Sequence, residues 1–252
     1  MKKESILITG GTGKLGKVFA THFAKKNMQV LISTTNLDKA IEFKKSFPEG
    51  KNVEFFLSDL CKKDAPKKLI EDISNKGFII NHLVNNARSL KSLKIGINGN
   101  SHREDMTNEY LLSVIVPYEL SIEIYSIQKN KIYTITNIGS QYGSVAANPA
   151  LYGGNLNESP IQYGLAKASL HHLTKELAIR LSKDNIRVNC IAFGGVKGRV
   201  NPIFEKRYSD LVPIGRMLEE NEVIGPLEFL ISESSSSITG HILAADGGWT
   251  IW

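Results

Sequence analysis

Short apolar runs alternate along the chain with segments in which apolar residues recur every three or four positions. The runs predict strands near 5–9, 28–33, 53–58, 79–84, 131–137, 186–191 and 241–245. The periodic segments predict helices near 14–26, 36–46, 64–75, 105–129, 161–183 and 220–232. Strands that alternate with helices are typical of a parallel sheet covered on both faces. We therefore expect an α/β fold with a doubly wound, parallel, seven-stranded sheet.

Three segments without a clear period follow the fourth, fifth and sixth predicted strands, at 88–104, 141–160 and 194–219. In an open α/β sheet, ligands bind outside the carboxyl ends of the strands. We expect these three loops to surround the substrate site. A chain of 252 residues in this class commonly forms one unit, so the sequence predicts a single domain over 1–252.

Composition narrows the functional classes. The net charge of +6 comes mostly from scattered lysine pairs, which indicate a solvated surface rather than a nucleic-acid stripe. The two cysteines, Cys61 and Cys190, are far apart and lack metal-ligand spacing, so we expect neither disulfides nor a metal site. A reducing cytoplasm fits this pattern. The N-terminal residues form no signal sequence, and no apolar run approaches the length of a membrane span, so we expect no membrane insertion.

The first predicted strand leads into a glycine-rich turn, Thr9-Gly10-Gly11-Thr12-Gly13-Lys14-Leu15-Gly16, and then into an amphipathic helix. Glycines at such a turn let the backbone approach a pyrophosphate, which the free N–H groups and dipole of the helix N-terminus attract. The turn therefore predicts a dinucleotide site. The alternative is a tight turn without a ligand.

The end of the second predicted strand bears on the choice of dinucleotide. An acidic residue there would bond the ribose hydroxyls of NAD and repel the 2′-phosphate of NADP, but residues 33–36 contain no carboxylate. The hydroxyls of Thr34 and Thr35, with Lys39 or Lys14 nearby, favour NADP over NAD. The same segment also fits a turn in which Thr35 or the next residue caps the following helix.

Tyr163 and Lys167 lie four residues apart in the longest predicted helix, so the phenol and the ammonium project from the same face. A neighbouring cation favours the phenolate, which makes proton exchange with an alcohol or carbonyl accessible near neutral pH. Oxidoreductases need this chemistry. Taken alone, such a pair is more often a packing residue beside a solvated one.

The glycine turn, Asn85-Asn86-Ala87, Ser140, Tyr163-x-x-x-Lys167 and Asp246-Gly247-Gly248 together resemble the short-chain dehydrogenase/reductase family over essentially all 252 residues. The resemblance implies an NAD(P)-binding Rossmann domain. It also implies that Tyr163 is the general acid/base, that Lys167 binds the nicotinamide ribose and eases ionisation of the tyrosine, and that Ser140 bonds the substrate oxygen. The candidate cofactor contacts are Gly10, Thr12, Gly13, Lys14, Leu15, Gly16, Thr34, Thr35, Asp59, Leu60, Asn86, Ala87, Tyr163, Lys167, Gly194 and Val196.

Some positions depart from the family's pattern. Lys14 stands where the family's middle glycine usually lies, which gives a glycine rhythm closer to the extended sugar-nucleotide branch. Ser113 aligns with the helix-4 asparagine that helps position a proton-relay water, with Asn108 as a poorer match, so Ser113 is the fourth catalytic candidate. Residues 193–198 lack the usual Pro-Gly and threonine, so nicotinamide contacts shift to backbone groups. Asp59 either contacts the adenine or caps a helix.

The connector 141–160 is rich in amides and phenols and resembles that of bacterial family members in sialic-acid-like sugar pathways for surface glycans. It predicts a polar small-molecule substrate with a hydroxyl or ketone, such as a sugar or nucleotide-sugar. Cations in 88–104 either meet a phosphate or carboxylate of that substrate or are simply solvated: Arg88, Lys91, Lys94, His102 and Arg103.

Two other functions stay open. A 3-oxoacyl or other apolar-ketone reductase would need an apolar cleft, and a cofactor-binding protein with little catalysis would account for the departures at Ser113 and 193–198. Members of the family form dimers or homotetramers, and Trp249 and Trp252 are candidates for such an interface.

Overall fold

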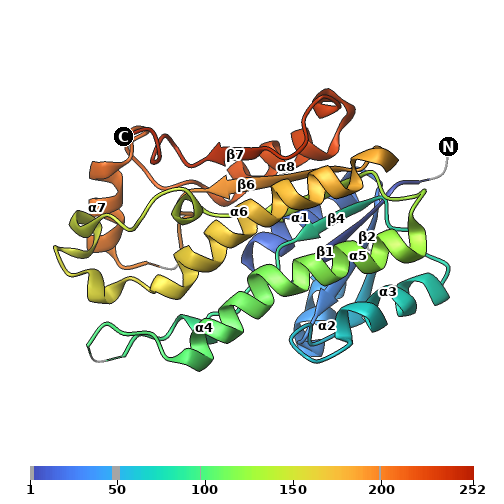
Figure 1. Ribbon diagram of the computed structural model, residues 1–252, viewed down its shortest axis with the longest axis horizontal. Helices are drawn as coiled ribbons and strands as arrows, with labels where there is room; N and C mark the ends of the chain where they lie inside the picture. Colours follow the sequence, from blue (N-terminus) through green and yellow to red (C-terminus); the bar gives the residue numbers. More distant parts are fainter. Residues whose placement is uncertain (1–2, 47–51, 97, 199) are drawn as a thin grey trace.

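Seven parallel strands form the central sheet in the order β3-β2-β1-β4-β5-β6-β7 (Figure 1). The computed structural model describes residues 3–46, 52–96, 98–198 and 200–252. The strands are β1 Ser5–Thr9, β2 Gln29–Thr34, β3 Val53–Leu57, β4 His82–Asn85, β5 Thr134–Ile138, β6 Arg187–Phe193 and β7 Ile242–Ala245. The predicted doubly wound α/β sheet is confirmed. Strand order reverses between β1 and β4, which places a ligand crevice at their carboxyl ends.

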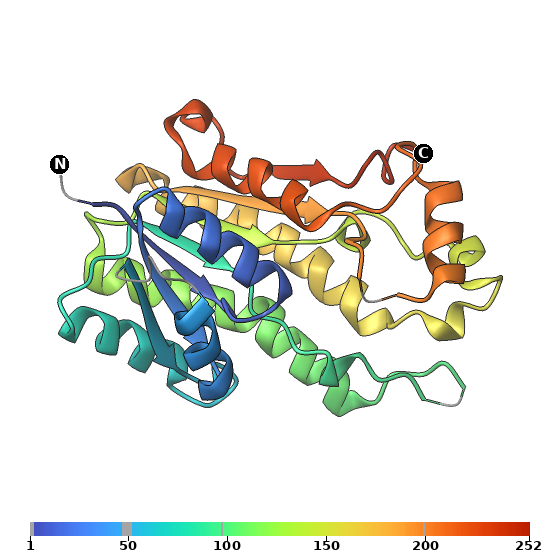
Figure 2. The same cartoon turned by 180° about the vertical axis from the view of Figure 1, so that it is seen from behind.

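Helices cover both faces of the sheet (Figures 1 and 2). Helices α3, α5 and α6 lie on one face, and α1, α2 and α8 lie on the other. The bounds are α1 Lys14–Lys25, α2 Leu37–Ser46, α3 Ala65–Asn75, α4 Arg103–Tyr110, α5 Val116–Gln128, α6 Ile161–Leu181, α7 Pro202–Leu211 and α8 Ile224–Ile231.

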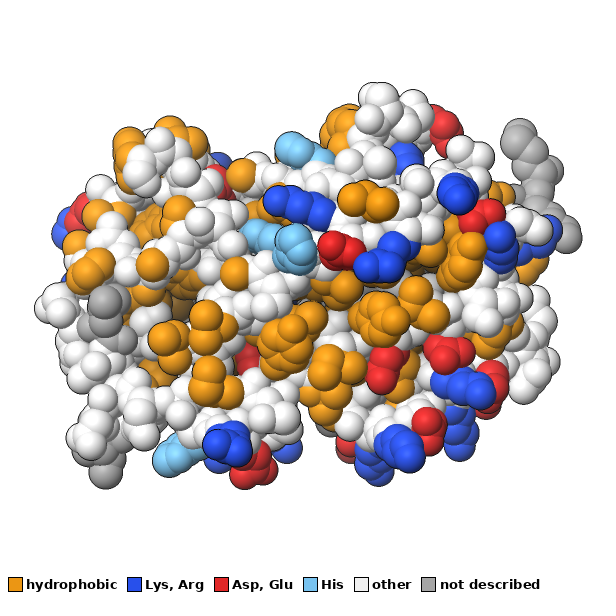
Figure 3. Space-filling view, viewed as in Figure 1, with side chains coloured by type: hydrophobic (Ala, Val, Ile, Leu, Met, Phe, Trp, Pro, Cys, Tyr) orange, Lys and Arg blue, Asp and Glu red, His pale blue; other side chains and the backbone are white. Residues whose placement is uncertain are grey.

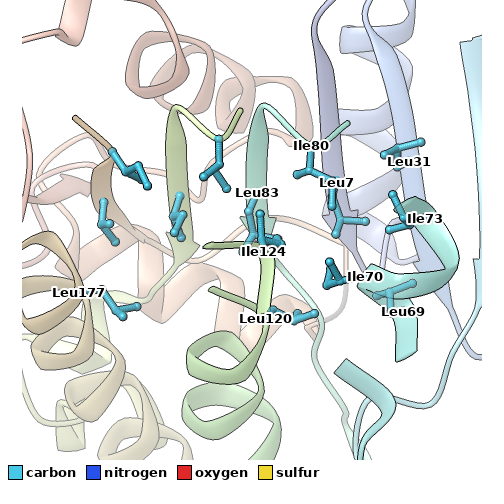
Figure 4. Close-up of a cluster of buried hydrophobic side chains, with 14 of the residues drawn as sticks. Leu7, Leu31, Leu69, Ile70, Ile73, Ile80, Leu83, Leu120, Ile124 and Leu177 are labelled. Atoms are coloured by element: carbon cyan, nitrogen blue, oxygen red, sulfur yellow. The ribbon is translucent and has the colours of Figure 1, made fainter. Parts of the chain in front are cut away.

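Alternate strand residues divide between two apolar cores because successive side chains on a strand point to opposite faces. Ile6 and Ile8 enter the core beneath α1 and α8, whereas Leu7 enters the core beneath α3, α5 and α6. Figure 4 shows the second core, in which Leu120 of α5 and Leu177 of α6 lie close to the strand residues. The continuous apolar runs of the sequence follow from this double burial.

The predicted helix 105–129 is one continuous rod of three elements. A π-helical turn, Leu111–Ile115, separates α4 from α5. Pro117 has no N–H and cannot bond the carbonyl of Ser113, so the α-helical ladder is interrupted here. The rod Arg103–Gln128 is long and apolar enough to span a membrane by composition. However, Leu120 and Ile124 lie buried against the sheet, so it is a core helix.

The loop 194–219 differs from the irregular segment that the sequence predicts, because it contains α7. The Asn201 side chain accepts a hydrogen bond from Phe204 N at 2.8 Å, and Pro202 begins the helix. Only Tyr208 of α7 is fully buried, so the apolar period was too weak to predict a helix. Trp249 stacks on Tyr208 with centroids 4.6 Å apart and is buried, which removes it as an interface candidate. Trp252 is exposed.

Candidate active site

The carboxyl ends of β1 and β4 are held together at the glycine turn. The backbone N–H groups of Asn86 and Ala87 each donate to Thr9 Oγ1 at 2.9 Å, and Asn86 Nδ2 donates to Thr9 O at 2.8 Å. Gly10 has φ +62°, and a Cβ there would lie 2.9 Å from Ala87 Cα. Only glycine fits this conformation and this close approach. The turn is therefore built into the crevice where strand order reverses.

The N-terminus of α1 opens into the same crevice. Gly13 precedes the helix, no side chain caps it, and its first turn has no acidic residue. The N–H groups of Lys14, Leu15 and Gly16 have no partner within the helix, so they and the helix dipole fit a pyrophosphate. A Cβ at Gly16 would lie 2.5 Å from Gly10 O, so this glycine serves the tight turn itself. The residues present fit a bound dinucleotide.

The adenosine end of the crevice is polar and uncharged on the β2 side. Thr12 Oγ1 and Thr34 Oγ1 form a hydrogen bond of 2.7 Å, and both residues are buried. Thr35 and Lys39 are exposed next to them. The side chain of Asn36 accepts from Lys39 N at 2.8 Å, so Asn36 rather than Thr35 caps α2.

Two predicted contacts have a second role in the structure. Asp59 Oδ1 accepts from Cys61 N at 3.2 Å, so it supports a turn after β3. The alternative that Asp59 caps the next helix is wrong, because α3 begins at Ala65 and Asp64 precedes it. Leu60 is buried in the core beside it.

Lys14 links the glycine turn to the segment after β6. Its Nζ lies 3.4 Å from Glu220 Oε1 and 3.5 Å from Val196 O. Gly194 N donates to Ala245 O at 3.1 Å, which fixes the start of this segment to the end of β7. Gly194 and Val196 therefore lie over the carboxyl ends of β6 and β7, on the crevice side where Lys14 lies.

The three central catalytic candidates converge at the end of β5. Lys167 is buried. Its Nζ donates at 2.7 Å to the carbonyl oxygen of Ile138, the last residue of β5. Tyr163 lies one helical turn earlier, with its ring centroid 5.7 Å from Lys167 Nζ. Ser140 follows β5 and is buried; its Oγ accepts from Tyr142 N at 3.2 Å, which leaves its hydroxyl proton available to another acceptor.

Two glycines allow the Ser140 turn, η4 Gln141–Gly143, to lie against α6. A Cβ at Gly139 would lie 2.5 Å from Cys190 Sγ and 2.7 Å from His171 Nε2. A Cβ at Gly143 would overlap the His171 ring. Ser140 therefore approaches the helix of Tyr163 and Lys167 because these two positions carry no side chain.

Ser113 faces Lys167 across a small cavity of about 10 Å³, whose lining includes both residues, Thr9 and Asn85. The π-helical turn places Ser113 there and leaves it buried, whereas Asn108 is exposed on α4. Of the two residues that the sequence offered for the helix-4 position, Ser113 is the one beside Lys167.

Other ionisable groups near the site are held neutral. Burial, with Tyr152 close by, raises the pKa of Tyr142 well above its usual range, and burial raises the pKa of Tyr208 to about 12. These phenols remain hydrogen-bonding groups. Burial and then the charge of Lys167 lower the pKa of His171 to about 4, so this histidine is uncharged at neutral pH. His171 thus packs as an uncharged residue between α6 and the η4 turn.

Two side chains near the site, Glu109 and Arg88, were missed or only partly foreseen. Glu109 is buried and accepts hydrogen bonds from Ser92 and Ser113. Its spacing of four residues from Ser113 could have predicted this contact. However, the polar run around Glu109 is typical of a solvent-exposed helix face. The Arg88 guanidinium carbon lies 4.6 Å from the centre of the Tyr163 ring, a contact between distant segments that no local pattern indicates.

Comparison with known proteins agrees with this geometry. A family model described as enoyl-(acyl carrier protein) reductase matches residues 13–250. The uncharacterized oxidoreductase YmfI of Bacillus subtilis is 30% identical over 98% of both chains. Post-translational flagellin modification protein A of Campylobacter coli is 25% identical over 99% of both chains. A 3-oxoacyl-[acyl-carrier-protein] reductase of Buchnera aphidicola is 28% identical over 98% of both.

Solved structures share the whole fold. A short-chain dehydrogenase of Leptospira borgpetersenii with bound NAD⁺ has a TM-score of 0.87 and 26% identity, covering 99% of this chain and 94% of that one. ElxO with NADP bound has a TM-score of 0.86 and 26% identity, covering 99% and 100%. Fold and site thus define a Rossmann-type oxidoreductase that uses NAD(P). The chain belongs to the short-chain dehydrogenase/reductase family.

Proposed function

We propose that this enzyme transfers hydride between NADP and a carbon bearing a hydroxyl or keto group in a polar, anionic substrate such as an acidic sugar or nucleotide-sugar. The bound cofactor gives or takes the hydride. Tyr163 exchanges the proton with the substrate oxygen, and Ser140 donates a hydrogen bond to that oxygen. Lys167 holds a fixed positive charge beside the phenol. The described parts of 88–104, 141–160 and 194–219 form the substrate side of the domain.

The observation that carries the substrate class is the position of Arg88. Its guanidinium lies over the Tyr163 ring and is exposed, and within the described residues it forms no ion pair with a carboxylate. A guanidinium has five donors suited to a carboxylate or phosphate, and here the group lies over the ring of the proposed acid/base residue. An anionic group next to the reacting carbon would bind there.

The loop after β5 supports a hydroxylated substrate. The hydroxyl groups of Tyr142 and Tyr152 lie 3.3 Å apart, and Gln141 accepts from Tyr208 at 2.9 Å. Gln141 and Tyr208 are buried and hold the base of the loop, whereas Tyr142 and Tyr152 are half-buried, and their hydroxyls suit sugar hydroxyls. The flagellin modification protein of Campylobacter coli, whose name places it in the modification of a surface structure, supports the same class.

The cofactor preference rests on the end of β2. The Thr12–Thr34 pair and exposed Thr35 and Lys39 offer donors to a 2′-phosphate and no carboxylate that would repel it. Lys14 is paired with Glu220, so Lys39 is the freer of the two predicted cations. We therefore favour NADP over NAD.

A second candidate is 3-oxoacyl reduction, because several relatives of 28–29% identity carry that name. A single panel separates the two. Purified enzyme is assayed with NADPH and NADH against acidic keto-sugars, neutral keto-sugars, nucleotide-linked keto-sugars and acetoacetyl-acyl carrier protein. Turnover confined to the acidic and nucleotide-linked sugars supports our proposal, whereas preference for the acyl carrier protein thioester or for neutral ketones rejects it.

Arg88→Gln tests the anion contact directly. We expect KM for an acidic substrate to rise at least about tenfold, with kcat/KM for a neutral analogue changed less than about twofold, because a lost charge-assisted pair costs about 1.5–3 kcal/mol. Lys91→Gln, an exposed cation of the same loop, is the matched control. An equal loss of kcat/KM on both substrates would show that Arg88 does not recognise the anionic group.

We further propose that the enzyme is a dimer or tetramer in which a second copy of the chain covers the outer face of α4 and α6. We also propose that it is cytoplasmic. Exposed apolar side chains gather over this face (Figure 3). They include Tyr110, Ile115 and Leu165, which line a groove of about 550 Å³. Both cysteines are free, which suits a reducing compartment. Light scattering of the purified protein measures the assembly, and a monomer would reject it.

A further inference from the structure

Glu109 is a buried carboxylate that the reaction as described does not use. Its side chain is 1% exposed, and within the described part of the chain it has no cation partner. Ser92 Oγ donates to Oε2 at 2.6 Å, and Ser113 Oγ donates to Oε1 at 3.0 Å. Burying a carboxylate without a cation is costly unless hydrogen bonds satisfy its oxygens, as the two serine hydroxyls do here.

The hydrogen bond to Glu109 sets the direction of the Ser113 hydroxyl. Its proton points at Glu109, so its lone pairs are left for a donor on the other side, where the cavity shared with Lys167 lies. Lys167 Nζ has three protons, and its hydrogen bond to Ile138 O uses one of them. A buried cation and a buried carboxylate thus lie on two sides of Ser113.

The cavity has the properties of a water site. Its volume of about 10 Å³ is at the lower limit of the space that one water molecule needs. Asn85 lines it, and Asn85 Oδ1 is buried without a hydrogen-bond partner, while Asn85 Nδ2 donates to Asn137 Oδ1 at 2.8 Å. A water would donate to Asn85 Oδ1 and to Ser113 Oγ and accept from Lys167, which gives it three polar partners.

We propose that Glu109 is a positioning residue for proton exchange: through Ser113 and a water in this cavity, it orients the hydrogen bonds to Lys167 and supplies the negative charge that balances the buried ammonium. This inference rests on the proposed role of Tyr163 and Lys167 but not on any substrate. Each hydrogen bond in this series donates in the direction from Lys167 to Glu109. The ammonium and the carboxylate therefore both stay charged and balance each other without any proton transfer.

The surroundings of Glu109 are consistent with this role. The short helix η2, Lys91–Leu93, and α6 pack against α4. Their charged or titratable groups near the site are Lys91, which is exposed, and Tyr163 and Lys167. Gln162 Nε2 donates to Ser92 O at 2.8 Å, so the segment that holds Glu109 is fixed to the start of α6 beside Tyr163.

Glu109→Gln keeps the side-chain shape and removes the charge. The readout is the phenolate absorbance of Tyr163 during a pH titration without cofactor or substrate, taken as the difference between each protein and its Tyr163→Phe counterpart. Removing a nearby negative charge favours loss of a proton, so we expect the midpoint to move to lower pH by at least about 0.3 unit. Glu109→Asp, which keeps the charge, should restore most of the wild-type midpoint.

Glu104→Gln is the matched control, because Glu104 lies exposed on the same helix and its charge is screened by solvent. An unchanged midpoint in Glu109→Gln, or an equal change in Glu104→Gln, overturns the proposal. A second measurement does not depend on the variant folding. A high-resolution crystal structure of the wild-type protein should show a water about 2.7–3.2 Å from Lys167 Nζ, Asn85 Oδ1 and Ser113 Oγ. A dry cavity also overturns the proposal, whatever the substrate panel gives.

Discussion

At the scale of single residues, the environment of each phenol separates Tyr163 from the other tyrosines near the site. Burial raises the pKa of both Tyr142 and Tyr208, with Tyr152 adding to the rise at Tyr142 and Asp246 to that at Tyr208, and keeps both phenols protonated. Tyr163 instead lies between two cations, with Arg88 Cζ 4.6 Å and Lys167 Nζ 5.7 Å from its ring centroid. Tyr163 is thus the one of these three phenols whose ring is in contact with cations.

Tyr163→Phe should reduce kcat at least about 100-fold while KM changes little, because positioned acid/base groups contribute about 10²–10⁴-fold. Steady-state kinetics with NADPH would measure it. Tyr142→Phe is the control with the same chemical change, and it should retain kcat within about tenfold. Wild-type turnover by Tyr163→Phe would remove Tyr163 from the chemistry.

Thr34→Asp should change the dinucleotide preference. A carboxylate at the end of β2 would repel the 2′-phosphate and bond ribose hydroxyls. We expect the ratio of kcat/KM for NADPH to that for NADH to fall at least about tenfold. Thr34→Ser keeps the hydroxyl that bonds Thr12 and should leave the ratio unchanged. A ratio that rises, or stays the same, in Thr34→Asp contradicts the NADP assignment.

At the scale of elements, strand positions were predictable because runs buried on both faces are continuously apolar. The predicted β1 matches Ser5–Thr9, whereas β4 begins later than expected, at His82, because Ile80 N donates to the Gln128 side chain instead of joining the ladder. The π-helical turn at Leu111–Ile115 and helix α7 were not predicted. Both depend on local features, Pro117 and the Asn201 cap before Pro202, that the apolar period does not encode.

The η4 turn depends on glycine at two positions, Gly139 and Gly143. Gly143→Ala would place a methyl group in the His171 ring and displace Ser140 from α6. We expect the free energy of unfolding to fall by about 1–3 kcal/mol and kcat to fall at least about tenfold. Denaturant unfolding and kinetics measure the two effects. Gly225→Ala in α8 has open space around its Cβ and should be neutral or stabilising. Full activity in Gly143→Ala would show that the turn tolerates a shift.

At the scale of the whole molecule, acid should destabilise the fold through buried histidines. The pKa of His171 is about 4 in the folded chain, lowered by burial and then by Lys167 and Lys175, against about 6.5 unfolded. The pKa of His82 is also lowered by burial. Between these values the unfolded chain binds more protons than the folded chain, so stability falls as pH decreases from about 6.5 to 4.

Each such histidine adds a slope of at most about 1.4 kcal/mol per pH unit in that range, and none above it. Urea unfolding at pH 7, 5.5 and 4.5 measures the slope. His171→Gln should flatten it, whereas His172→Gln, an exposed neighbour on the same helix, should not. Equal slopes in all three proteins would mean that His171 is not the group being protonated.

The two tryptophans give the molecule a built-in optical reporter. Trp249 is stacked on Tyr208, whose hydroxyl bonds Gly195 N at 2.7 Å in the segment over the crevice, whereas Trp252 is exposed. A Trp252→Phe protein would therefore emit from a single indole shielded from water. Any rearrangement of the 194–219 segment when a dinucleotide enters would then register as a change in the colour and intensity of that emission.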